Sequence, residues 1–167
     1  MPEIVHLDDP ARTVFTDFTK EHPVTIKPDA SIDQALEQMK HSGICVLLVI
    51  DEDKRLLGEI IADDLMGEKP VRMAESTGLH HSEITVEMMM IPREQVQVLE
   101  IEHLRDARVG HIIATLHVLE SRYVLVIENG SIRGLFAAGQ MSRQLGRNIM
   151  DAEVPAHSLA EIVHTLG

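Results

Sequence analysis

Acidic side chains are the most abundant groups in this sequence that could bind a metal or do acid-base chemistry. The run Asp51-Glu52-Asp53 offers carboxylates for calcium. A calcium loop that begins at Asp51 needs Gly at its sixth place and Glu at its twelfth. The sequence has Leu56 and Ala62 there. We therefore expect this run to form a solvated hairpin turn.

The ten histidines do not form a pattern typical of a metal site. His80 and His81 are adjacent, and neighbours in a regular element do not point at one ion. His157 and His164 are seven residues apart, on one face of an expected helix, but no third ligand accompanies them. We expect these His side chains to face solvent or a partner.

The sulfur-containing residues favour packing over catalysis. Cys45 lies inside an apolar run without an evident orienting group, so we expect a buried core side chain and not a nucleophile. The run Met88-Met89-Met90 fits core packing better than copper binding, because flexible thioethers fill gaps. The sequence shows no phosphate loop, nucleophile elbow or zinc quartet. We expect no catalytic residues, no metal site and no enzyme activity.

The composition excludes several classes of partner. The chain has 167 residues, a formal net charge of -12 and 2% aromatic residues. Nucleic acid and anionic membranes bind basic surfaces, and single strands also need aromatic stacking, so neither is an expected partner. The single cysteine excludes an internal disulfide. With no signal-peptide pattern and no apolar run long enough to span a membrane, we expect a cytoplasmic protein.

The elements that would position a site form a unit that occurs twice. In the first copy we expect a strand at 24–26, a helix between Ser31 and Gly43, strands at 44–50 and 56–61, and a helix that begins at Asp63-Asp64. In the second copy we expect strands at 96–98, 123–127 and 133–137, with helices that begin near 109 and 141. Asn129-Gly130 predicts a two-residue hairpin turn.

This repeated order resembles a tandem pair of cystathionine-β-synthase (CBS) domains, also called a Bateman module. The resemblance is carried by PVTIKPDASIDQALEQM, VLLVIDEDKRLLGEIIADDL and ITVEMMMIP. It implies an α/β (α+β) fold of two βαββα repeats packed about a pseudo-twofold axis, at 14–78 and 84–146, the second of them degenerate. From the apolar spacing we also expect a C-terminal helical extension at 151–167, capped by Ser158.

In the family, each repeat ends in a glycine, then a Thr or Ser, then an Asp that typically holds the ribose of an adenine nucleotide. The first copy keeps the acid as Asp64 but has Ile61 in the hydroxyl position, and the second copy has Ala137 and Gln140 in these two positions. The resemblance gives six candidate ligand-binding residues: Thr25, Ile26, Val46, Leu47, Ile61 and Asp64. A second interpretation of Asp64 is a helix cap that needs no ligand.

The resemblance implies a stand-alone regulatory module that binds an adenine nucleotide and signals to a protein partner. AMP, ADP, ATP and S-adenosylmethionine are the candidate ligands, and we expect a homodimer. The alternative is a CBS-fold dimer that has lost its ligand and acts as a protein interaction module, as Ile61, Ala137 and Gln140 suggest. A third hypothesis is an enzyme that uses its His or carboxylate side chains.

Overall fold

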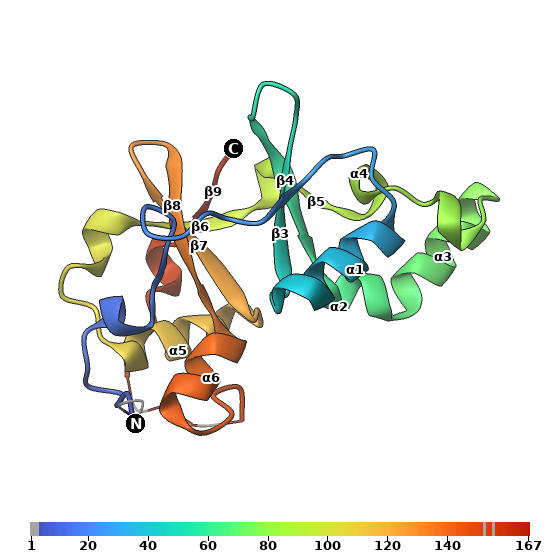
Figure 1. The fold of residues 1–167 in the computed structure, drawn as a ribbon. Coiled ribbons are helices and arrows are strands. Elements are labelled where there is room, and N and C mark those ends of the chain that lie inside the picture. Colours follow the sequence, from blue (N-terminus) through green and yellow to red (C-terminus); the bar gives the residue numbers. More distant parts are fainter. Residues whose placement is uncertain (1–3, 152, 155) are drawn as a thin grey trace. The chain divides into compact units, whose positions relative to one another are not determined.

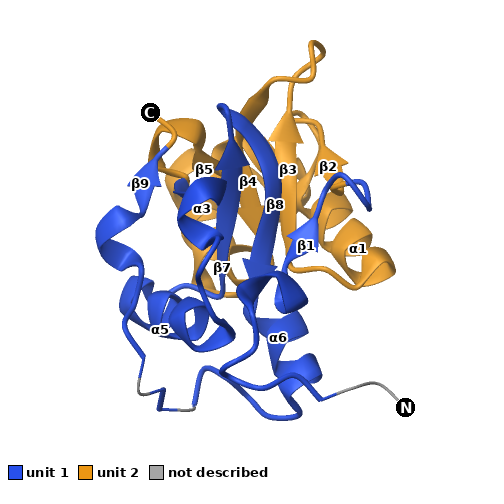
Figure 2. Ribbon diagram, turned by 90° about the vertical axis from the view of Figure 1, so that its left-hand side faces the viewer, with its two compact units in different colours: residues 1–22, 97–165 blue, residues 23–96, 166–167 orange. Residues whose placement is uncertain are grey.

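The structure is a computed structural model that describes residues 4–151, 153–154 and 156–167. The chain divides into two compact units, each with its own sheet and helices (Figure 1). Unit 1 comprises Met1–His22 and Gln97–Thr165, and unit 2 comprises Pro23–Val96 and Leu166–Gly167 (Figure 2). Each unit combines a small sheet with helices, so the fold is the mixed α and β fold that the sequence predicts.

Unit 2 contains the first copy of the repeat. Its four-stranded sheet has the order β2-β3-β4-β5, with β2 parallel to β3 and the other pairs antiparallel. The strands are β2 (Thr25–Ile26), β3 (Val46–Ile50), β4 (Leu56–Ile61) and β5 (Ile91–Pro92). The helices are α1 (Ile32–Ser42), α2 (Ala62–Met66), α3 (Glu68–Thr77) and α4 (Val86–Met89).

Local sequence signals explain the boundaries of these elements. The Ser31 side chain accepts from the Gln34 backbone N–H, the Gln34 side chain accepts from that of Ser31, and Gly43 ends α1 in the left-handed conformation, as predicted. The turn between β3 and β4 is a hairpin in which Asp51 Oδ1 accepts from the backbone N–H groups of Asp53 and Arg55, at 2.8 and 2.9 Å. The carboxylate of Asp51 thus closes the predicted turn.

Unit 1 contains the second copy. Its five-stranded sheet has the order β1-β8-β7-β6-β9. The strands are β1 (Thr16–Asp17), β6 (Gln97–Glu100), β7 (Tyr123–Glu128), β8 (Ser131–Ala137) and β9 (His164–Thr165), and the helices are α5 (Val109–Leu119) and α6 (Ala138–Leu145). Asn129 and Gly130 connect β7 to β8 with φ angles of 52° and 80°. These positive values are those that a two-residue hairpin turn requires, so the predicted turn is confirmed.

The strand that precedes each copy in the sequence joins the sheet of the other copy. β1 pairs with β8, so that Asp17 lies opposite Gly134, and β5 pairs with β4, so that Pro92 lies opposite Gly58 (Figure 2). A Cβ atom on Gly58 would lie 2.2 Å from the Ile91 carbonyl oxygen, and one on Gly134 would lie 2.1 Å from that of Thr16. The compact units therefore differ from the sequence ranges 14–78 and 84–146.

The predicted C-terminal helix is wrong. Beyond Ser158 the chain forms a short 3₁₀ turn (Ala160–Ile162) and then β9, which pairs antiparallel with β6. A short apolar face does not sustain a helix by itself, whereas the edge of β6 carries backbone groups that need partners. His157 and His164 consequently do not share a helix face. Positions 152 and 155 of the predicted extension lie outside the described residues.

The prediction that Cys45 is buried is also wrong, because its side chain is exposed. The apolar run begins at Ile44, but β3 begins one residue after Cys45. The Cys45 carbonyl accepts from the Ala62 N–H at 2.9 Å, which fixes the backbone at the entrance of the strand. The side chain at this position therefore lies before the buried part of the strand.

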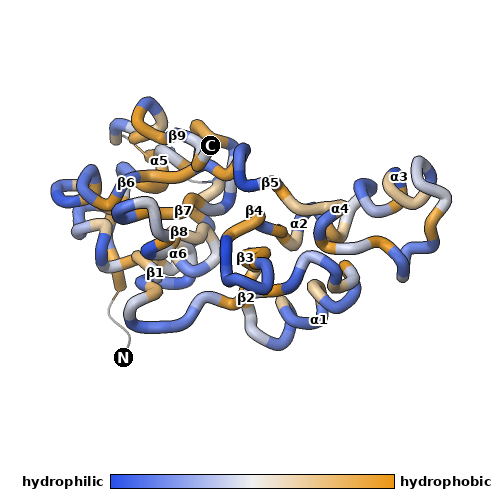
Figure 3. The backbone as a smooth tube through the Cα atoms, turned by 90° about the horizontal axis from the view of Figure 1, so that it is seen from above, coloured by the Kyte–Doolittle hydropathy of each residue, from blue (hydrophilic) through white to orange (hydrophobic). Residues whose placement is uncertain are grey.

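Each unit has a separate hydrophobic core between one face of its sheet and its helices. In unit 2 the core includes Ile32, Leu47, Val49 and Ile60, and in unit 1 it includes Leu99, Val124, Val126 and Phe136. Figure 3 shows the apolar residues along the strands and the hydrophilic turn between β3 and β4. Among the described residues, no helix is long and apolar enough to cross a membrane.

Candidate functional site

Three of the six candidate residues lie on one face of the unit 2 sheet, near one of its ends. Val46 at the start of β3 pairs with Ile61 at the end of β4, and Thr25 pairs with Leu48 two residues further along β3. Side chains two residues apart on a strand, and those directly opposite on a neighbouring strand, share a face. Thr25, Val46 and Ile61 are thus brought together.

Ile26 and Leu47 face the other way. Both side chains belong to the hydrophobic core of unit 2, and Leu47 is fully buried. Alternation along a strand requires this, since each is the direct neighbour of a residue on the candidate face. Ile26 and Leu47 can therefore contribute to a ligand site only through their backbone groups.

Asp64 lies beyond the end of β4, in the first turn of α2. Its side chain is 12% exposed and forms an ion pair and hydrogen bond with the ammonium of Lys69, whose side chain is 63% exposed. Gly67 separates α2 from α3, so that Lys69 in the first turn of α3 contacts the carboxylate five residues before it. The bond from Lys69 involves Oδ1 of Asp64, which is one of the two carboxylate oxygens.

The interpretation of Asp64 as a helix cap is wrong. Ile61 occupies the cap position before α2, and its side chain makes no capping hydrogen bond. Asp64 is instead the third residue of the helix, where its negative charge is favourable at the positive end of the helix dipole. The burial of its carboxylate beside a lysine is therefore not explained by capping.

The corresponding positions in unit 1 differ in chemistry. Tyr123 pairs with Ala137, as Val46 pairs with Ile61 in unit 2, and Val98 pairs with Leu125, as Thr25 pairs with Leu48. Gln140 follows in α6, and its Oε1 accepts from the Thr16 hydroxyl of β1 at 2.6 Å. The second copy thus has the aromatic ring of Tyr123 where the first has Val46. It has the amide of Gln140, already hydrogen-bonded to Thr16, where the first has the carboxylate of Asp64.

Comparison with known proteins identifies the repeat. The sequence model of the CBS domain family matches residues 4–70, which include β2, α1, β3, β4 and α2. This part of the chain is similar to a CBS domain. The match ends before the second copy. The similarity of the second copy to the first rests on its topology. No curated protein matches the chain.

Solved structures show the same fold. An uncharacterized conserved protein from Pyrococcus horikoshii is 20% identical, with a TM-score of 0.61 over 83% of this chain and 92% of that one. A CBS-domain containing protein from Agrobacterium tumefaciens is 20% identical, with a TM-score of 0.59 over 78% and 93% of the two chains. CBSX2, solved in complex with AMP, is 22% identical, with a TM-score of 0.54 over 81% and 94%.

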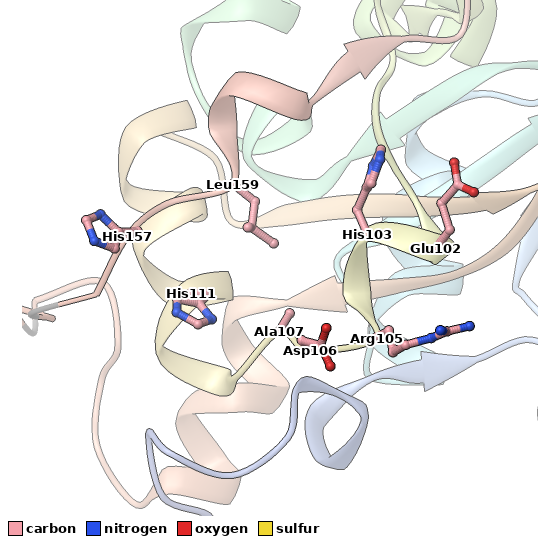
Figure 4. A pocket seen from close by; sticks show the side chains of 8 residues that line it. All are labelled: Glu102, His103, Arg105, Asp106, Ala107, His111, His157 and Leu159. Atoms are coloured by element: carbon pink, nitrogen blue, oxygen red, sulfur yellow. The ribbon is translucent and has the colours of Figure 1, made fainter.

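Unit 1 also carries an open depression of about 820 Å³, and none of the CBS positions named above lines it. It is lined by residues that sequence reasoning did not combine: Glu102, His103, Arg105, Asp106, Ala107, His111, His157 and Leu159. Figure 4 shows His111 and His157 on one side, Glu102 and His103 on the other, and Arg105 pointing away. Within the described part of the chain, no three His, Cys, Asp or Glu side chains are placed to hold a metal ion.

Lys69 is the residue of the CBS site region that sequence reasoning missed. The sequence predicts a short helix at 71–77 with Pro70 in its first turn, whereas α3 already begins at Glu68, two residues before Pro70. The earlier start makes Lys69 helical and directs it to Asp64. Only the break at Gly67, which no periodicity reveals, would have indicated this contact.

Proposed function

We propose that this CBS-domain protein is a regulatory module that binds an adenine nucleotide in unit 2, beside Asp64, and transmits the bound state to a protein partner. The observation that carries the proposal is the placement of a largely buried carboxylate at the end of a sheet face formed by Thr25, Val46 and Ile61. Such a carboxylate can accept two hydrogen bonds from ribose hydroxyls, and the apolar side chains can cover an adenine ring.

The CBSX2 structure supports this ligand class, since that protein of the same fold was solved with AMP. Burial of Asp64 makes its hydrogen bonds to a ligand stronger than they would be in water. Unit 1 lacks a carboxylate at the corresponding position, where the Gln140 oxygen already accepts from Thr16. We therefore place the ligand in unit 2.

Calorimetric titration with AMP, ADP, ATP and S-adenosylmethionine tests the proposal. We expect at least one of them to bind, and Asp64→Ala to weaken that binding by about 10- to 100-fold, because a ribose hydroxyl loses its charged acceptor. Asp53→Ala is the matched control, since Asp53 is exposed on the hairpin turn. We expect this variant to bind like the wild type.

Circular dichroism of both variants shows whether the fold is kept. Equal loss of binding in the two variants, or binding that survives Asp64→Ala, contradicts the assignment of the site. No heat with any of the four ligands, at concentrations that detect micromolar binding, contradicts the ligand class.

If none of the four ligands binds, we propose the second candidate function, a CBS-fold dimer that acts as a ligand-free interaction module. Two observations favour it: Ile61 offers no hydroxyl, and Lys69 already neutralises Asp64. Either function requires a partner, and we propose a homodimer as the working form, which sedimentation equilibrium measures directly. A ligand can signal only if it binds two states of the module with different affinities.

A further inference from the structure

We propose that residues 156–165 form a releasable strap that occupies a peptide-binding groove of unit 1, and that an extended apolar segment of a partner protein takes its place when the strap leaves. The groove is formed by Gly110 and Thr115 of α5 and by the edge of β6. It belongs to unit 1, so the inference goes beyond the proposed function and does not depend on nucleotide binding in unit 2.

Helix α5 is buried on all sides, unlike the corresponding helix α1. In α1 the buried residues Ile32, Ala35 and Met39 lie on one face. In α5 the consecutive residues 112–115 are all buried, and four consecutive residues point in all directions around a helix. The face of α5 away from the sheet therefore needs a cover. The 3₁₀ turn at Ala11–Val14 covers part of it, and the strap covers another part.

The strap shows which peptide chemistry fits the groove. The Leu159 backbone N–H donates to the hydroxyl of Thr115 at 2.7 Å, and that hydroxyl in turn donates to the His111 carbonyl at 2.7 Å. The side chains of Leu159 and Val163 pack against the core of unit 1, and β9 adds a short strand to β6. Strand addition with pockets for apolar side chains is a common mode of peptide recognition. A partner segment needs only an extended backbone and two apolar side chains in the same places.

The strap is held less firmly than the groove beneath it. Thr115 is fully buried, whereas none of residues 156–165, all of which the structure describes, is buried. The open depression of unit 1 lies beside the strap, lined by His157 and Leu159 on the strap and by Ala107 and His111, among others (Figure 4). Segments with few buried contacts open at a lower free-energy cost than a core does. The strap can therefore leave while the rest of unit 1 stays folded.

A labelled peptide with the strap sequence, AHSLAEIVHT, tests the proposal by fluorescence anisotropy with the full chain. The wild-type chain should bind it weakly, because the tethered strap competes at a high effective concentration. In a Leu159→Ser/Val163→Ser variant the strap loses its apolar contacts while the groove keeps its residues, and we expect at least about tenfold tighter binding. Adding Thr115→Val should weaken this binding about five- to tenfold, because the peptide amide loses its acceptor.

Thr77→Val is the matched control for the loss of the hydroxyl. Thr77 on α3 donates to the carbonyl four residues earlier at 2.7 Å, as Thr115 does, but its other bond is to the Leu79 N–H of the same unit. Added to the strap variant, this substitution should leave peptide binding unchanged. A peptide that carries the two Ser substitutions should not bind.

A strap variant that keeps the circular dichroism spectrum of the wild type but does not bind the peptide overturns the inference. Equal binding to the wild type and the strap variant overturns it too, because the strap would not compete. Equal weakening by Thr115→Val and Thr77→Val assigns the loss to helix stability, and loss of the fold in the strap variant makes the strap part of the core; both also overturn it. None of these outcomes concerns nucleotide binding beside Asp64, and failure of the nucleotide titrations leaves this inference intact.

Discussion

Asp64 and Gln140 hold corresponding positions in the two units but have different partners. The carboxylate of Asp64 is charged, largely buried and paired with a flexible lysine. The amide oxygen of Gln140 on α6 accepts from the hydroxyl of Thr16 at 2.6 Å, and Thr16 lies on β1 at the edge of the unit 1 sheet. For the proposed nucleotide, an occupied amide in place of a carboxylate would remove about 1–3 kcal/mol of hydrogen bonding to the ribose. This difference between two residues favours a single ligand site.

Gly58 and Gly134 are expected to be indispensable for the two sheets. In each case a neighbouring carbonyl oxygen occupies the space of a Cβ atom, at 2.2 and 2.1 Å. We expect Gly58→Ala and Gly134→Ala each to lower the free energy of unfolding by about 2–3 kcal/mol, because the pairing strand must move. Urea denaturation measures this. Gly139→Ala is the control, since its Cβ would lie 3.7 Å from Arg143, and a change comparable with the other two would contradict the explanation.

At the scale of the element, β1 is held by charge as well as by backbone pairing. Arg133 on β8 donates to both carboxylate oxygens of Asp17 on β1, at 3.2 and 3.3 Å, and to Glu128 on β7 at 3.0 Å. The hydrogen bond from Arg133, with those from Thr19, holds the pKa of Asp17 well below its usual range. The two-residue strand is thereby attached to two other strands of unit 1.

The lowered pKa of Asp17 predicts a dependence of stability on pH. Because the folded pKa is below the unfolded value, the stabilisation is complete above about pH 4 and is lost as the pH falls through the folded pKa. We expect Asp17→Asn to be less stable than the wild type at pH 7, and the difference to shrink below about pH 4. Urea denaturation at several pH values measures the difference. A constant difference from pH 7 to pH 3 would contradict this role.

Elements with local signals could be predicted from the sequence, and elements without them could not. Ser31 and Gly43 determine the two ends of α1, and Asn129-Gly130 forms the turn between β7 and β8. These residues act on the backbone next to them, so the sequence alone indicates the structure. The strands β1, β5 and β9 have two residues each, too few to show an alternation of apolar and polar residues. They form because another strand offers them a free edge. The same holds for the candidate site. Asp64 could be predicted from the family pattern, whereas its contact with Lys69 could not, because it depends on where α3 begins.

At the scale of the whole molecule, the N-terminal segment belongs to unit 1 although it is followed directly by unit 2. Its backbone bonds to unit 1 are spread along its length: Val5 to Gln144, Leu7 to Gly110, Asp9 to Val109 and Ala11 to Ala107. The segment then adds β1 to the edge of β8. The connection between His22 and Pro23 is thus the first point where the chain leaves one unit for the other.

We expect the N-terminal segment to stay bound when the chain is cut at this connection. A protease site inserted between His22 and Pro23 would yield a short peptide and a large fragment. Because of the pairing of β1 and the bonds above, the two should elute together in size-exclusion chromatography. Asp17→Asn in the peptide should promote its release. Dissociation of the wild-type peptide under native conditions would contradict the assignment of residues 4–22 to unit 1.

The split composition of unit 1 also sets an order of assembly on the ribosome. The part Pro23–Val96 of unit 2 is continuous and can collapse as soon as it emerges, whereas β1 must wait for β8. At about 5–20 residues per second, several seconds of translation separate them. During this interval β1 has no partner strand, and Phe15 and Phe18 beside it lack the neighbours that they have in the folded unit.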